Sequence, residues 1–170
     1  MIFLIGMMGS GKSTVGRELA KALDYSFIDT DSVIEDRYMK IHKLIKREGI
    51  DVFRDIENQV LKDIVATSLS QKIIIATGGG IILRRENREV IEKSSKKIIY
   101  LKNSIDSLIR HLQSDNLSKR PLLNTDLNNT LTHLLSERSE LYEGLATFTI
   151  TCDHLNKKAL VEQIKQSLLA

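Results

Sequence analysis

The sequence predicts an α/β protein, a three-layer sandwich in which a five-stranded parallel sheet lies between two layers of helices. Two observations lead to this fold class. Five short apolar runs alternate along the chain with stretches in which apolar residues recur at the spacing of one helix face. The first run also passes through a glycine-rich turn directly into a helical stretch, as happens where a parallel strand feeds a crossover helix.

The five apolar runs are the expected strands, because each has the length and composition of a buried strand. They occupy residues 2–5, 25–28, 72–76, 97–101 and 147–151. Helical spacing is seen in Ile56, Val60, Leu61 and Ile64, in Leu127, Leu131, Leu134 and Leu135, and in Leu160, Val161, Ile164 and Leu168. No linker or repeat interrupts this alternation, so we expect one domain over residues 1–170.

The glycine-rich turn, GMMGSGKS at residues 6–13, predicts a site for the phosphates of a nucleotide. Glycines let successive backbone N–H groups point into one concavity, and the helix that follows adds its positive dipole end. Lys12 is placed to reach the β- and γ-phosphates, and the Ser13 hydroxyl to meet the accompanying magnesium ion. We expect Lys12 to be a charge at the solvent edge. The predicted phosphate-binding residues are Gly9, Ser10, Gly11, Lys12, Ser13 and Thr14.

Two carboxylates follow the second predicted strand, in the sequence Asp29-Thr30-Asp31. Ligands of a parallel sheet bind outside the carboxyl ends of its strands, so these residues should lie beside the phosphate site. Asp29 could hold the magnesium ion directly or through water, and Asp31 could take the proton of an attacking hydroxyl. The alternative is helix capping by Asp31 or Ser32.

Three further stretches could complete a substrate site at the same edge. Gly78, Gly79 and Gly80 follow the third strand, where their bare backbone could contact a substrate, although a buried turn is the alternative. Arg54 and Arg138 could form a fork-shaped clamp for a planar anion such as a carboxylate, although arginines on helices are often solvated surface charges.

A polar stretch without clear periodicity, residues 113–126, has the length of a lid and carries the only proline of the chain, Pro121. Arg120 within it could be brought onto the phosphates when the lid closes, neutralising charge during phosphoryl transfer. An ordinary surface loop is the alternative interpretation, and composition does not separate the two.

Composition narrows the classes of partner and location. A net charge of +3 is too small to indicate nucleic-acid binding, and no apolar run approaches membrane-spanning length. The single Cys152 cannot form an internal disulfide, so we expect it to be buried in the core, and the four histidines show no zinc-ligand spacing. With no room for a signal peptide before the first strand, we expect a cytoplasmic monomer.

Six motifs together resemble the shikimate kinase family: GMMGSGKS, DTD, FRDIE, TGGG, RPLL and ERSELY, which span nearly the whole chain in the family's order. The resemblance implies the fold of the nucleoside monophosphate kinases, with strand order 2-3-1-4-5 and a mobile lid. It also implies transfer of the γ-phosphoryl group of MgATP to the 3-hydroxyl of shikimate, a step toward chorismate and the aromatic amino acids.

The resemblance assigns a role to each matching residue. Lys12 and Ser13 serve the phosphates and magnesium, Asp29 supports the metal, and the substrate segment covers residues 31–60. The remaining roles are Asp31 as the base, Arg54 and Arg138 on the carboxylate, Gly78, Gly79 and Gly80 along the substrate, and Arg120 as the lid arginine.

The chain departs from the family's usual pattern in places. Ile50 and Glu140 replace a common glutamate and a common proline, and the Asn-Pro pair that often follows the last strand is absent. The adenine contacts therefore stay unassigned, with Arg110 as one candidate for the basic residue before the lid.

Rival functions are a gluconate kinase or nucleoside monophosphate kinase of the same fold, and a nucleotide-binding switch. A phosphate acceptor needs no base, so Asp31 favours a hydroxyl acceptor.

Overall fold

The structure is a computed structural model that describes residues 1–114 and 126–169. Nearly all of the predicted lid, including Arg120, lies outside the described residues. The strands are β1 (Ile2–Ile5), β2 (Ser26–Asp29), β3 (Ile73–Ala76), β4 (Ile98–Lys102) and β5 (Phe148–Thr151). The helices are α1 (Lys12–Leu23), α2 (Thr30–Arg37), α3 (Ile41–Glu48), α4 (Ile50–Ser68), the 3-10 helix η1 (Ile81–Leu83), α5 (Arg85–Ser94), α6 (Ile105–Ser114), α7 (Leu127–Leu145) and α8 (Lys157–Leu169).

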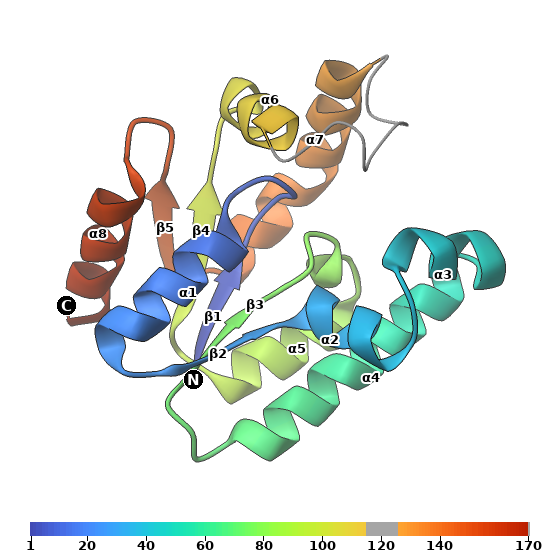
Figure 1. Ribbon diagram of the computed structural model, residues 1–170, viewed down its shortest axis with the longest axis horizontal. Coiled ribbons are helices and arrows are strands. Elements are labelled where there is room, and N and C mark those ends of the chain that lie inside the picture. Colours follow the sequence, from blue (N-terminus) through green and yellow to red (C-terminus); the bar gives the residue numbers. More distant parts are fainter. Residues whose placement is uncertain (115–125, 170) are drawn as a thin grey trace.

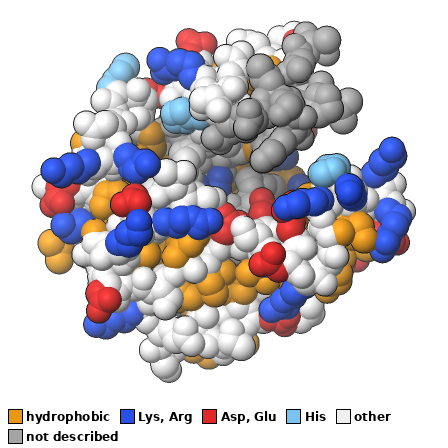
Figure 2. All heavy atoms as spheres, viewed as in Figure 1, with side chains coloured by type: hydrophobic (Ala, Val, Ile, Leu, Met, Phe, Trp, Pro, Cys, Tyr) orange, Lys and Arg blue, Asp and Glu red, His pale blue; other side chains and the backbone are white. Residues whose placement is uncertain are grey.

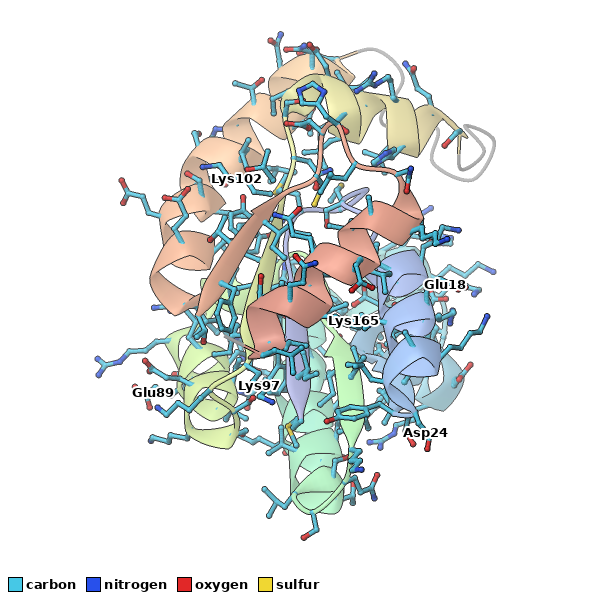
Figure 3. All side chains as sticks on the ribbon, turned by 90° about the vertical axis from the view of Figure 1, so that its left-hand side faces the viewer. Glu18, Asp24, Glu89, Lys97, Lys102 and Lys165 are labelled. Atoms are coloured by element: carbon cyan, nitrogen blue, oxygen red, sulfur yellow. The ribbon has the colours of Figure 1, made fainter. Side chains whose placement is uncertain are left out.

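The strands form one parallel sheet in the order β2-β3-β1-β4-β5, as predicted. Each observed strand end lies within one residue of its predicted position. Because β1 is central, the loop that follows it opens at the middle of the sheet edge. Figure 3 shows in which direction the parallel strands run, because Lys97 lies just before β4 and Lys102 at the carboxyl end of that strand.

Side chains of successive strand residues enter opposite cores, which gives the predicted three layers. Phe3 and Ile5 of β1 join a core under α4, α5 and α7, whereas Ile2 and Leu4 join a second core under α1 and α8. The two helix layers lie on either side of the sheet, and α2 and α3 extend beyond its edge next to β2 (Figure 1). Cys152 is buried in the second core, as expected.

Among the helices that the structure describes, we find none whose length and apolar content would let it cross a membrane.

Candidate active site

The glycine-rich loop lies between β1 and α1, at the carboxyl edge of the sheet. Gly9 and Gly11 have φ angles of 77° and 84°, in the left-handed region that side chains disfavour, so glycine is required there. Gly11 is also the N-cap of α1, and no side chain of the described residues caps this helix. The N–H groups of the first helical turn therefore suit an anion such as a phosphate.

Lys12 differs from the sequence prediction, because its side chain is buried rather than at the solvent edge, with 8% of the residue exposed. The ammonium donates to the backbone oxygens of Gly6 at 2.8 Å and Met7 at 2.7 Å, and to Ser10 Oγ at 3.3 Å. Burial lowers the pKa of Lys12 to about 8, against the opposing effect of Asp31 and other acidic charge. The loop's own carbonyls hold this charge where the phosphates are expected.

Asp29 is the cap of α2, and the capping alternative for Asp31 and Ser32 is wrong. Asp29 Oδ1 accepts hydrogen bonds from the N–H groups of Asp31 at 3.0 Å and Ser32 at 3.2 Å, because the backbone of Asp29 is still extended where the helix begins. Its Oδ2 accepts from the Ser13 hydroxyl. The two residues predicted to serve the metal are therefore in direct contact.

Asp31 stands in the first turn of α2 with its carboxylate close to the turn after β3. A Cβ atom added to Gly78 would lie only 2.5 Å from Asp31 Oδ1. Burial, and then the negative charges of Asp29 and Glu57, raise the pKa of Asp31 to about 6, although Lys12 opposes the rise. A carboxylate with such a pKa is ionised at neutral pH and can still accept a proton effectively.

Arg54 and Glu57 form a partly buried ion pair on α4, one helical turn apart. Arg54 Nη1 donates to Glu57 Oε2 at 2.7 Å, and the Glu57 side chain is only 1% exposed. Glu57 Oε1 has no hydrogen-bond partner among the described residues. Burial raises the pKa of Glu57, even though Arg54 works in the opposite direction. The backbone of Gly80 lies against the guanidinium, since a Cβ there would overlap Arg54 Nη2.

Helix α7 contributes Arg138 and Tyr142, one turn apart and both buried. Arg138 is 7% exposed, and its Nε has no partner among the described residues. Its charge lowers the pKa of Lys12, as expected of a nearby cation. The Tyr142 hydroxyl donates to the backbone oxygen of Gly79, while its ring stacks on Tyr100 with centroids 4.9 Å apart. The tyrosine thus ties α7 to the glycine turn.

A cavity of about 390 Å³ lies at this edge of the sheet, and Figure 2 shows the molecule hollowed beside the phosphate loop. Of the predicted site residues, 9–14, Asp29, Asp31 and Gly79 line it. Arg54, Gly78, Gly80 and Arg138 do not line it, but the contacts above bring Arg54, Gly78 and Gly80 to its acidic side. The lining also includes the apolar side chains of Leu112, Cys152 and Leu155.

Sequence reasoning assigned no role to Glu57 or Tyr142. Each lies one helical turn after a predicted arginine, Glu57 after Arg54 and Tyr142 after Arg138, and each is the last residue of a motif quoted above, FRDIE or ERSELY. Arg110, the candidate for an adenine contact, lines a neighbouring hollow instead. His111 lines the cavity beside the glycine-rich loop, with Nδ1 at 2.8 Å from the Gly9 oxygen.

This strand order, with a glycine-rich loop opening at its centre beside paired carboxylates, defines a P-loop kinase. A protein-family model described as "Shikimate kinase" matches residues 8–169. A shikimate kinase of Vibrio vulnificus is 40% identical over 169 residues, which are 98% of this chain and 95% of that protein. The chain belongs to the shikimate kinase family, and it is an ATP-dependent kinase.

Solved structures agree with this assignment. A structure of shikimate kinase from Acinetobacter baumannii in complex with shikimate has a TM-score of 0.89 and 33% identity, covering 99% of this chain and 92% of that one. A gluconokinase from Sinorhizobium meliloti has a TM-score of 0.64 and 21% identity, covering 99% of this chain and 90% of that one. At this identity the similarity to the gluconokinase shows only a shared fold, so it does not support gluconate kinase activity.

Proposed function

We propose that the chain transfers the γ-phosphoryl group of MgATP to the 3-hydroxyl of shikimate, giving shikimate 3-phosphate and ADP in chorismate and aromatic amino-acid biosynthesis. The observation that carries this proposal is that Asp31 lines the cavity together with the phosphate loop and also lies close to Gly78, two residues before the Gly80 backbone on which Arg54 rests. The hydroxyl oxygen attacks the γ-phosphorus, the bond from that phosphorus to the bridging oxygen breaks, and Asp31 takes the hydroxyl proton.

The phosphate loop orients and stabilises the transferred group. Residues 9–14 offer backbone N–H groups, and the Lys12 ammonium, already directed into the loop, meets the negative charge that shifts onto the leaving phosphate. Arg120 stays the proposed lid arginine, although it lies outside the described residues. Positive charge at the phosphates favours the charge distribution of the transition state over that of bound ATP.

Magnesium fits the contact between Ser13 and Asp29, which gathers a hydroxyl and a carboxylate, the oxygen donors that this ion prefers. No cluster of three or more acidic, histidine or cysteine ligands occurs within residues 1–114 and 126–169. Such a cluster is not needed, because magnesium keeps several waters and binds the phosphates themselves. When bound, the ion neutralises phosphate charge, and Ser13 and Asp29 hold it in place.

The acceptor side selects a hydroxyl compound that carries a carboxylate. Arg54 and Arg138 present planar guanidinium groups for that carboxylate, and Glu57 occupies one edge of Arg54 so that other donors remain for the ligand. The backbone at Gly78 lies directly beside Asp31 and that at Gly80 beside Arg54, whereas Gly79 lies against the backbone of Gly6, Met7 and Met8, so there is no space for a side chain at any of the three positions. An acceptor with a phosphate in place of the hydroxyl would be repelled by Asp31.

The nucleotide base is proposed to lie against the apolar lining residues Leu112 and Leu155 of the cavity. We also propose that the enzyme acts as a monomer in the cytoplasm, with no nucleic-acid or membrane partner. The small net charge of +3 supports the absence of a nucleic-acid partner.

Turnover with MgATP against shikimate, gluconate and AMP tests the function directly. We expect phosphorylation of shikimate and, at the same concentrations, rates at least about a hundredfold lower for the other two. AMP brings a phosphate to Asp31, and the open chain of gluconate does not fix its hydroxyl relative to its carboxylate as a ring does. Calorimetry on Arg54→Lys should show shikimate affinity reduced about tenfold or more with ADP affinity unchanged, because lysine loses the paired donors. Arg37→Lys, on the exposed face of α2, is the matched control. Preferred turnover of gluconate or AMP would overturn the proposal.

A further inference from the structure

Asn87 is a fully buried amide, 0% exposed, in the first turn of α5, and the proposed mechanism does not use it. Its Nδ2 donates to the backbone oxygen of Ile81 at 2.9 Å, and its Oδ1 accepts from Asn58 Nδ2 at 2.6 Å. A backbone carbonyl only accepts, so the nitrogen must face Ile81 and the oxygen must face Asn58. Asn87 therefore bridges η1 and α4.

The two ends of this bridge stand on either side of the contact between Arg54 and Gly80. Asn58 follows Arg54 by one helical turn on α4, and Ile81 follows Gly80 directly. The Gly80 backbone is the surface on which the Arg54 guanidinium rests, since a Cβ there would overlap it. The bridge thus sets the distance between the helix that carries the arginine and the backbone that the arginine lies against.

We propose that Asn87 is a positioning residue for the acceptor carboxylate, which acts by holding α4 and the turn after Gly80 at the separation that orients Arg54. This inference rests on the proposed function. A binding group has to be held within about half an ångström of its productive geometry, and neighbouring contacts supply that constraint. Asn87 supplies this constraint through its buried contacts with Asn58 and Ile81, and it does not touch the substrate.

Only an amide of this length meets both partners. Aspartate would accept from Asn58, but it would place a charge against the Ile81 oxygen, and leucine would fill a similar volume with neither hydrogen bond. A second tie between α4 and the end of η1, Arg84 Nη1 to Asp55 Oδ1 at 2.5 Å, is exposed and therefore weakened by solvent. The buried amide bridge is the stronger constraint.

The test compares Asn87→Leu and the milder Asn58→Ala with a control of similar stability cost, Ile164→Ala, in the core on the opposite face of the sheet. Turnover of shikimate by the unaltered enzyme is measured first, and it tests the proposed function alone. We expect both asparagine variants to raise KM for shikimate about threefold to tenfold and leave KM for MgATP within about twofold. Ile164→Ala should lower the melting temperature without changing either KM.

A double-mutant cycle tests whether the effect passes through Arg54. In an Arg54→Lys background, Asn87→Leu should change KM for shikimate by less than about twofold, because the arginine that it positions is gone. The inference would be overturned if the asparagine variants changed KM for shikimate and KM for MgATP equally, or if their KM values matched those of Ile164→Ala. It would also be overturned if Asn87→Leu raised KM for shikimate as much in the Arg54→Lys background as in the wild type. Should Asn87→Leu fail to fold, the same comparisons made with Asn58→Ala decide the matter.

Discussion

The proposed phosphate side and the proposed acceptor side of the site are built in different ways. The phosphate side is one continuous stretch, residues 6–14, in which glycine φ angles and backbone carbonyls arrange Lys12. The acceptor side is assembled from α2, α4, the turn after β3, and α7, which are far apart in the sequence. The first depends on local backbone conformation, whereas the second depends on how whole helices pack.

The two sides also differ in how completely their polar groups are paired. The Lys12 ammonium has three acceptors within the loop, but Glu57 Oε1 and Arg138 Nε have no partner among the described residues. An unpaired buried polar atom costs about 1–3 kcal/mol, so a ligand that pairs it binds more tightly. We therefore expect changes on the phosphate side to alter rate, and changes on the acceptor side to alter affinity for the acceptor.

The largest effect is expected for Asp31→Asn, at the boundary between the two sides. The amide keeps the volume but cannot take the hydroxyl proton, so kcat should fall by about a hundredfold to ten-thousandfold, measured in a coupled assay. The acid limb near pH 6, set by the raised pKa of Asp31, should vanish from the kcat profile of the variant. Wild-type turnover across the pH range would show that Asp31 is not the base.

The same variant has an expected effect on stability whose sign follows from the pKa. The pKa of Asp31 is raised from 3.8 to about 6, so the folded state binds the proton more tightly, and ionisation destabilises the fold. This penalty is absent below about pH 4, grows as the pH rises, and is complete above about pH 6. Asp31→Asn should therefore raise the melting temperature at pH 7.5 and leave it nearly unchanged at pH 4. An equal shift at both values would contradict the assigned pKa.

Lys12→Ala is expected to have the next largest effect. Loss of a preorganised charge at the departing phosphate should lower kcat by about a hundredfold to a thousandfold, with shikimate affinity in calorimetry nearly unchanged. Lys158→Ala, an exposed lysine on α8, is the control for net charge and should keep full activity. If Lys12→Ala weakened shikimate binding as strongly as it lowered kcat, the separation between the two sides would fail.

This difference between the sides also explains how much the sequence could predict. The resemblance of the motifs to a known family implied the strand order, and apolar runs predicted the strand positions. The runs at β1, β3 and β4 are buried on both faces of the sheet, whereas β2 and β5 at its edges are partly exposed. The phosphate loop was predicted because its geometry depends on residues next to one another, as the φ angles of Gly9 and Gly11 illustrate.

What the sequence could not predict depends on tertiary contacts. The sequence predicted Lys12 at the solvent edge, but its ammonium donates to the backbone oxygens of Gly6 and Met7 and is buried. Every residue has a backbone oxygen, so the types of residue in the loop do not indicate this contact. Asp29 rather than Asp31 proved to be the cap, since that depends on where the strand becomes a helix. The Asn87 bridge joins residues far apart in sequence through an amide, and buried amides carry no periodic pattern.

Gly80→Ala tests the acceptor side through backbone proximity alone. The new methyl group would displace the Arg54 guanidinium, so KM for shikimate should rise about tenfold, while KM for MgATP stays the same. Gly144→Ala on α7 is the matched control, because its Cβ would meet nothing within 4 Å. In the control we expect unchanged kinetics and a stability gain of about 0.5–1 kcal/mol from helix propensity. Unchanged KM in Gly80→Ala would mean that Arg54 does not hold the acceptor.

The smallest effect is expected for Tyr142→Phe, which removes one hydrogen bond and keeps the ring. Phenylalanine retains the stack on Tyr100 but no longer donates to the Gly79 oxygen, so α7 is held less firmly against the glycine turn. Because α7 also carries Arg138, we expect KM for shikimate to rise about threefold to fivefold, with kcat and KM for MgATP nearly constant. Tyr38→Phe, on an exposed tyrosine, is the control and should behave as wild type. A lower kcat with normal KM in Tyr142→Phe would instead place Tyr142 with the phosphate side and break the distinction between rate and affinity.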